Sequence, residues 1–169
     1  MLRDLKGKQF KIRFAEEKDI DLILEMIREL AVYEKMLDEV VATEARLREY
    51  VFEKKMVEVI IGEYQDEPVA FALFFPNFST FLGKPGLYLE DLYIKPEMRG
   101  KGFGRKIFTF LANLTRERGY GRLEWVCLDW NEPSICFYKK MGAVPMEDWT
   151  TYRMQGTALE NLADKYKET

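Results

Sequence analysis

The sequence contains no histidine. Histidine is the commonest general base near neutral pH, the commonest metal ligand, and the usual partner that activates a serine or cysteine nucleophile. Its absence excludes nucleophilic sites that depend on a Ser-His or Cys-His pair. Carboxylates, tyrosines, lysines, backbone amides or water are left for any proton transfer.

Cysteine is also scarce. The only two, Cys127 and Cys136, lie in apolar surroundings with no second pair near them. A disulfide framework or a cysteine-rich metal site needs more cysteines at characteristic spacings. We therefore expect neither a disulfide framework nor a bound metal.

Long apolar runs and a one-sided charge are missing too. No run approaches the roughly 18 apolar residues that span a membrane, and the stretch MLRDLKGKQF has no signal-peptide core. The formal net charge of −3 gives no global basic field of the kind that binds nucleic acid. We predict a cytoplasmic protein with no membrane or nucleic-acid partner, in which any anion site is local.

What is present indicates one α/β domain over residues 1–169. A chain of 169 residues with 47% hydrophobic content can bury one sizeable core. Alternating apolar residues predict a strand near 9–14, and β-branched and aromatic residues predict strands over 57–64 and 67–75 with a hairpin turn at 65–66. Further strands are expected over 86–94 and 122–128, with a loop over 76–86. Helical spacing and capping residues predict helices near 18–33, after Thr43, from the glycine-rich turn that contains Gly104 as far as Gly119, and from Asn131 to Gly142. The tail alternates again over 149–154, and a short helix is expected over 159–166.

Residues 87–111 stand out, because an apolar strand runs through a basic, glycine-rich turn into an amphipathic helix. Glycines allow positive φ and let several N–H groups converge, and the start of the helix adds its positive dipole end. The turn contains the glycines Gly100, Gly102 and Gly104 and the cations Arg99, Lys101 and Arg105. The sequence matches neither a Walker A loop nor the dinucleotide GxGxxG motif. It predicts another phosphate ligand, and the alternative is a solvated basic loop before a surface helix.

Four segments together resemble a known family: LAVYEKM, LYLEDLYI, RGKGFG and WNEPSICFYKKMGA. The chain is similar, over nearly its whole length, to the GCN5-related N-acetyltransferases (GNAT), and within them to the diamine (spermidine/spermine) acetyltransferases and their thialysine-acetylating relatives. The resemblance implies a GNAT fold, with a mixed central sheet, helices on both faces and two splayed parallel strands that form an acetyl-CoA groove. It also implies a homodimer, acetyl-CoA as co-substrate and a small amine as acceptor.

The resemblance assigns acetyl-CoA to the space between strands 89–94 and 123–128. Backbone groups would pair with the pantetheine, the turn would wrap the pyrophosphate, and the start of the next helix would meet the cofactor. The cofactor-binding set is then Leu92, Tyr93, Ile94, Arg99, Gly100, Lys101, Gly102, Phe103, Gly104, Arg105, Asn131 and Ser134.

Acetyl transfer from a thioester to an amine poses two proton problems. The ammonium must lose a proton before it attacks, and the departing thiolate, whose ordinary pKa is about 8.5, benefits from gaining one. The resemblance implies that Tyr138 is the general acid and that Glu90, directly or through water, is the base. Helix periodicity alone favours a different role for Tyr138, which is packing with Ile135 in the core.

A cationic acceptor requires carboxylates and aromatic faces. The resemblance assigns these roles to Tyr33, Glu34, Glu90, Asp91, Glu147 and Trp149. Because neighbouring residues of a regular strand point to opposite faces, Glu90 and Asp91 can serve one site only if the strand bulges. Otherwise one of them is a solvated acid, and for Glu34 and Glu147 a solvated surface position is the alternative.

The expected function is acetyl transfer from acetyl-CoA to a primary amine of a small diamine or polyamine, by direct attack in a ternary complex. One alternative is another acceptor on the same scaffold, such as thialysine, another amino acid, an aminoglycoside or a protein amine. A second alternative is a non-catalytic acyl-CoA-binding module, against which the presence of both Glu90 and Tyr138 argues.

Overall fold

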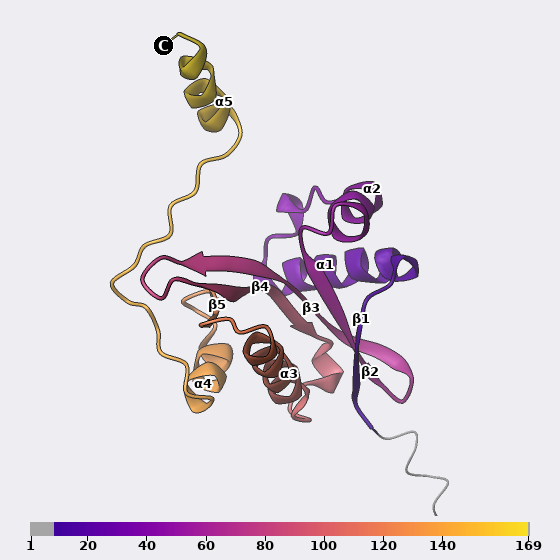
Figure 1. Ribbon diagram of the computed structural model, residues 1–169. Coiled ribbons are helices and arrows are strands. Elements are labelled where there is room, and N and C mark those ends of the chain that lie inside the picture. Colours follow the sequence, from indigo (N-terminus) through magenta and orange to yellow (C-terminus); the bar gives the residue numbers. More distant parts are fainter. Residues whose placement is uncertain (1–8, 169) are drawn as a thin grey trace, which may run out of the picture. The chain divides into compact units, whose positions relative to one another are not determined.

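The computed structural model describes residues 9–168 (Figure 1). The chain forms two compact units, of which the first ends at Val126 and the second begins at Cys127. Each unit is described by itself, and the single domain expected from the sequence stays a prediction.

The first unit contains the sheet and three α-helices. Its elements are β1 (Lys11–Phe14), η1 (Glu17–Asp19), α1 (Ile20–Glu34), η2 (Leu37–Glu39), α2 (Glu44–Leu47), the π-helix η3 (Arg48–Glu53), β2 (Glu58–Tyr64), β3 (Glu67–Ser79), β4 (Lys84–Ile94), η4 (Pro96–Met98), α3 (Phe103–Glu117) and β5 (Leu123–Trp125). The second unit contains α4 (Glu132–Lys140), α5 (Thr157–Asp164) and η5 (Lys165–Glu168).

The five strands form one sheet in the order β1-β2-β3-β4-β5. The first four pair antiparallel, and β5 pairs parallel to β4. Residues of α1 and α2, including Ile23 and Met26, pack with Phe71 and Tyr93 in one core cluster against the sheet. Helix α3 covers the opposite face (Figure 1). The predicted α/β class, with helices on both faces of a mixed sheet, is confirmed.

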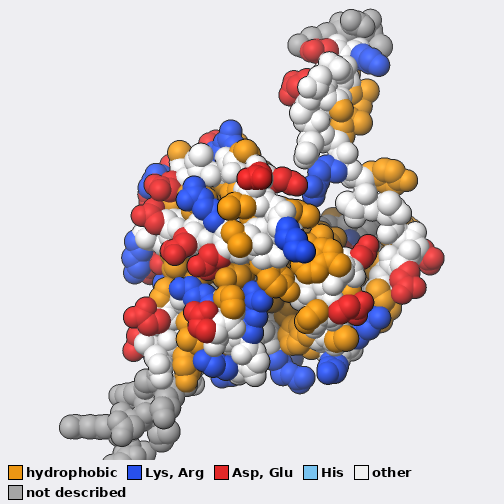
Figure 2. Space-filling model, turned by 180° about the vertical axis from the view of Figure 1, so that it is seen from behind, with side chains coloured by type: hydrophobic (Ala, Val, Ile, Leu, Met, Phe, Trp, Pro, Cys, Tyr) orange, Lys and Arg blue, Asp and Glu red, His pale blue; other side chains and the backbone are white. Residues whose placement is uncertain are grey.

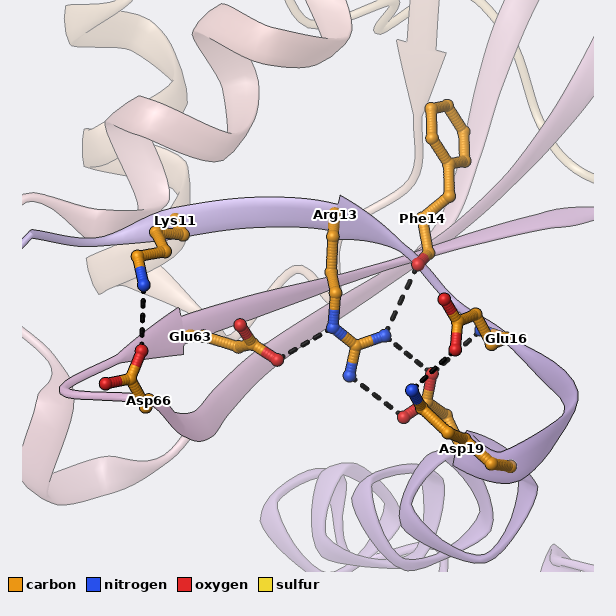
Figure 3. Close-up of polar contacts among 8 residues, drawn as sticks. Lys11, Arg13, Phe14, Glu16, Asp19, Glu63 and Asp66 are labelled. Carbon is orange, nitrogen blue, oxygen red and sulfur yellow. Dashed lines mark hydrogen bonds and ion pairs between the residues drawn. The ribbon is translucent and has the colours of Figure 1, made fainter.

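A partly buried ion network fixes where α1 begins (Figure 3). Arg13 of β1 donates two hydrogen bonds to Asp19, at 2.6 and 2.9 Å, and its Nε donates to Glu63 of β2 at 2.7 Å. Asp19 also accepts from the backbone N–H of Glu16, which closes a capping box. The hydrogen bonds from Arg13 hold the pKa of Asp19 below its ordinary value. Helix α1 is thereby aligned on the sheet, and so is its far end at Tyr33 and Glu34.

Backbone geometry confirms several local predictions. Gln65 and Asp66 both have positive φ, as a two-residue hairpin turn between right-twisted strands requires. Thr43 accepts a hydrogen bond from the N–H of Arg46 and caps α2. Gly119 has a φ of 69° just after α3, and Gly142 has a φ of 91° just after α4. Each of these residues ends or starts an element within two residues of the predicted place.

The predicted loop over residues 76–86 is wrong. Strand β3 continues to Ser79 and β4 starts at Lys84, so that Pro76 pairs with Leu87. Proline usually interrupts a strand because it has no N–H to donate. Strand β2 begins only opposite Phe74, so the other side of β3 has no neighbouring strand beyond that residue. A proline is tolerated at such an edge.

Two further strand predictions need correction. Strand β5 covers only 123–125 instead of 122–128. The alternating segment 149–154 forms no strand, and the described part of the second unit contains none. Alternation gives a strand only when a neighbour supplies hydrogen bonds, and periodicity does not report that neighbour. The short C-terminal helix is confirmed as α5.

Candidate active site

Strand β4 bulges at Glu90. Leu73 pairs with Asp91, but the next residue of β3, Phe74, pairs with Leu89, so Glu90 has no residue opposite it. Leu89 therefore lies on the other face of the sheet from Asp91, although residues two positions apart share a face in a regular strand. The bulge that Glu90 and Asp91 need in order to serve one site is present.

Beyond the bulge, one edge of β4 lies open. Strand β5 pairs with β4 only at 87–89, so residues 90–94 have no strand partner on that side within the described residues. The N–H of Lys95 donates to the carbonyl of Val69, at 3.0 Å, on the β3 side. Antiparallel pairs alternate in hydrogen bonding, so the backbone groups of Leu92 and Ile94 point to the open edge. The splay predicted between the two parallel strands is present as this open edge.

The glycine turn lies just after the open edge. Gly100 has a φ of 76°, and Gly102, the N-cap of α3, has a φ of 81°. A Cβ at either glycine would meet nothing within 4 Å, so the space around them is open. The first N–H groups of the 15-residue α3 have no partner within the helix and carry its positive dipole end. With exposed Lys101 and Arg105 beside them, these groups fit a phosphate ligand.

Two predicted cofactor residues turn their side chains into the protein. The ring of Phe103 is 5% exposed and stacks on Phe10, with 4.3 Å between centroids. Tyr93 is 4% exposed and belongs to the core beneath α1. A ligand at this edge could meet these residues only through the backbone.

Three carboxyl groups gather around the bulge. Burial, and then the negative charges of Glu90 and Glu34, raise the pKa of Asp91 to about 6. Burial also raises the pKa of Glu34, at the end of α1. Among the described residues, none of the three forms an ion pair. An ammonium group close to these carboxyls would relieve the repulsion between them.

The ring of Tyr33, the neighbour of Glu34 on α1, contacts the guanidinium of Arg99. The guanidinium carbon of Arg99 lies 4.4 Å from the centroid of the Tyr33 ring and 5.7 Å from that of Tyr93. The Nε of Arg99 donates to the carbonyl of Ile94, at 3.0 Å. The structure thus brings Tyr33, Glu34 and Asp91 to the same end of the sheet as the glycine turn.

Glu29 is a residue of this region that the sequence analysis missed. Burial, and then the charge of Glu29 and a hydrogen bond to it, raise the pKa of Tyr93 to about 12. Glu29 precedes Tyr33 by four residues, so both lie on the same side of α1. That spacing was the available signal.

The remaining candidates lie in the second unit. Asn131 is buried, and its Oδ1 accepts from the N–H of Ser134 at 3.4 Å, which caps α4. Tyr138 is half-buried, with its ring centroid 5.5 Å from that of Phe137. Glu147 and Trp149 are exposed. The functional roles of these residues stay predictions.

Comparison with known proteins agrees with this geometry. The model of the acetyltransferase (GNAT) family matches residues 23–143. The chain belongs to that family, and it is accordingly an N-acetyltransferase. A thialysine N-epsilon-acetyltransferase of Caenorhabditis elegans is 38% identical over 161 residues, which cover 94% of this chain and 99% of that one. This relative belongs to the branch of the family that the sequence motifs indicated.

Two more relatives extend the comparison. An L-ornithine N5-acetyltransferase of Arabidopsis thaliana is 30% identical over 198 residues, covering 90% of this chain and 87% of that one. An integron cassette protein from the mobile metagenome of V. cholerae has a similar solved structure, with a TM-score of 0.77 and 27% identity, covering 93% of this chain and 99% of that one.

The surface carries no field of one sign on the face that Figure 2 shows, where basic and acidic side chains are interspersed. None of the described helices combines the length and the apolar character needed to cross a membrane. Within residues 9–168, no three His, Cys, Asp or Glu side chains are grouped so that they could hold a metal ion.

The raised pKa of Asp91 predicts a pH-dependent cost to stability. Its folded pKa of about 6 exceeds the ordinary 3.8, so between these values the unfolded chain has released a proton that the folded chain keeps. The free energy of unfolding therefore falls as the pH rises through this window. Relative to Asp91→Asn, the wild type should lose about 2 kcal/mol between acid and neutral pH, allowing for partial exposure. Urea unfolding at several pH values measures the difference.

Asp21→Asn, at an exposed position of α1, is the matched control for that experiment. Its stability relative to the wild type should not rise with pH in this way. A constant difference between wild type and Asp91→Asn would show that Asp91 carries no such cost.

Proposed function

We propose that the protein transfers the acetyl group of acetyl-CoA to a primary amine of a small diamine or polyamine, by direct attack in a ternary complex. The observation that carries the proposal is the group of carboxyls at the β4 bulge, immediately before the open edge and the glycine turn. The group suits an acceptor with more than one positive charge.

The cofactor set from the sequence analysis is proposed in the same arrangement. Acetyl-CoA supplies the activated thioester when it is bound. The outward backbone groups of Leu92 and Ile94 suit the amides of an extended chain, and the turn at 99–105 suits a pyrophosphate. Asn131 and Ser134 are proposed to contribute from the start of α4. Backbone recognition explains why buried side chains such as Phe103 can belong to the set.

Two residues are proposed to move protons. Glu90 would accept the proton of the acceptor ammonium, directly or through water, since it is exposed beside Asp91 on the bulge. Tyr138 would donate its hydroxyl proton to the departing sulfur. Glu147 and Trp149 are proposed acceptor contacts, together with Tyr33 and Glu34. A homodimer is the assembly that we expect from the family.

A second acceptor class is favoured by the comparisons. The relatives described above are named for thialysine and L-ornithine, two amino acids with a side-chain amine. Such an acceptor also carries an ammonium that the carboxyl group could bind, but its α-carboxylate would be repelled unless a nearby cation compensates. The two classes therefore differ at the end of the acceptor that does not react.

Initial rates of thiol release from acetyl-CoA test the proposal. The panel contains putrescine, spermidine, thialysine, L-ornithine and a lysine peptide, each at several concentrations. The proposal expects the highest kcat/KM for a diamine or polyamine, whereas a preference for thialysine or ornithine selects the second class. Activity on the peptide alone would overturn both, and CoA binding without any turnover would indicate a binding module.

Gly102→Ala tests the phosphate role of the turn. Alanine at a φ of 81° costs about 1–2 kcal/mol of stability. Its Cβ would also project into the open space where the pyrophosphate is proposed. We expect CoA affinity to fall about tenfold or more, comparable to one lost charged hydrogen bond. Calorimetric titration with CoA measures it.

Gly83→Ala is the matched control, because Gly83 also has positive φ and open space around it but lies in the β3–β4 turn. It should show a similar loss of stability with unchanged CoA affinity. Equal CoA affinity in both variants would remove the turn at 99–105 from the proposed cofactor site.

A further inference from the structure

Arg99 joins three segments of the first unit. Its guanidinium packs against Tyr33 at the end of α1, 4.4 Å from the ring centroid, and lies 5.7 Å from the Tyr93 ring of β4. Its Nε donates to the carbonyl of Ile94, the last residue of β4. The next residue, Gly100, begins the positive-φ part of the turn.

These contacts suit a guanidinium better than any other cation. A planar guanidinium stacks on aromatic rings and can donate from Nε while its face is covered. A lysine ammonium has no planar face and no donor at that point of the side chain. The carbonyl of Ile94 keeps a second lone pair, so the bond from Arg99 leaves the open edge able to accept another donor.

The same contacts set the spacing between the two halves of the proposed site. Glu34 follows Tyr33 directly, and its charge acts on Asp91. Tyr93 also interacts with Glu29 of α1, through a side-chain hydrogen bond. The end of α1 is thus fastened to β4 and to the turn through Arg99, and the position of Glu34 depends on that fastening.

We propose that Arg99 is a positioning residue for the acceptor, whose side chain fastens the end of α1 to β4 and the glycine turn and does not bind the pyrophosphate. The inference rests on the proposed function, since it needs an amine acceptor at the carboxyl group. It refines the role of one residue of the proposed cofactor set, and Lys101 and Arg105 keep their roles at the turn.

Arg99→Lys separates positioning from phosphate binding. If Arg99 binds pyrophosphate through its charge, lysine should largely preserve CoA affinity, and Arg99→Ala should lose it. If Arg99 positions the acceptor, both variants should keep CoA affinity and raise the acceptor KM about tenfold, with a smaller change in kcat. Tyr33→Leu, which removes the ring against the guanidinium, should reproduce the rise in acceptor KM and leave CoA affinity unchanged.

The measurements are calorimetric titration with CoA and steady-state kinetics with the best acceptor of the panel. Thermal unfolding of each variant shows whether it is folded. Arg105→Ala is the control in which CoA affinity should fall. A loss of CoA affinity in either Arg99 variant, or an unchanged acceptor KM in both, would overturn the inference while leaving the proposed function intact. Absence of amine acetylation by the wild type would instead overturn the proposed function.

Discussion

Asp91→Asn is expected to lower kcat/KM for a diamine acceptor by about ten- to a hundredfold at pH 8. A hydrogen bond to a charged group contributes about 1.5–3 kcal/mol, and each 1.4 kcal/mol is a factor of ten. At pH 8 the carboxyl is ionised, because its pKa is about 6. The amide keeps the size of the side chain but removes the charge that attracts the acceptor ammonium. Steady-state kinetics with saturating acetyl-CoA measure the loss.

Measuring the stability of Asp91→Asn together with its activity separates a local effect on the acceptor from a loss of folded protein. The same substitution should stabilise the fold at neutral pH, because it removes a buried charge next to Glu34 and Glu90. Lower activity in a more stable protein cannot come from partial unfolding. Asp21→Asn should leave the activity unchanged and should not stabilise the fold, because Asp21 lies in the first turn of α1 and its charge favours the helix. A similar loss of activity in that control would show that Asp91 has no special role.

Tyr138→Phe is expected to lower kcat by a factor between about a hundred and ten thousand, the usual range for general acid catalysis. Phenylalanine keeps the ring, which lies 5.5 Å from that of Phe137 in the second unit. The packing of α4 should therefore survive, and the affinity for acetyl-CoA should stay the same. The kinetics are compared with calorimetric titration of CoA into the same variant.

Tyr50→Phe provides the control for Tyr138→Phe. Tyr50 is 42% exposed on η3, and its ring lies against Lys54. Removing its hydroxyl should change neither kcat nor CoA affinity. Unchanged turnover in Tyr138→Phe would exclude Tyr138 as the acid, and packing within α4 would then be its whole role.

Features that depend on local sequence were predictable. The glycine turn was found because positive φ at Gly100 and Gly102 is a property that glycine alone adopts without strain. The caps at Thr43 and Asn131 were found because a short polar side chain there satisfies a nearby N–H. The extent of α1 also follows from a local pattern of apolar residues.

Features that depend on pairing between distant segments were not predictable. The bulge at Glu90 arises from the register of β4 against β3, in which Leu73 pairs with Asp91 and Phe74 with Leu89. From the sequence, the bulge could be named only as the requirement for Glu90 and Asp91 to serve one site. The length of β5 and the pairing of Pro76 with Leu87 likewise depend on which neighbour a strand has. The contact of Glu29 with Tyr93 joins α1 and β4, which are far apart in the sequence, so no local pattern predicts it.

The central claim is that an acidic group at the β4 bulge binds the acceptor of an acetyl transfer. The most direct test is the ratio of kcat/KM for the amine between wild type and Asp91→Asn across the pH range. Because the acceptor titrates equally in both proteins, the ratio isolates Asp91, and kcat/KM reports the free enzyme. We predict a ratio that is near one in acid, rises through a pH of about 6 and then levels off. A ratio that stays constant over the whole range would contradict the claim.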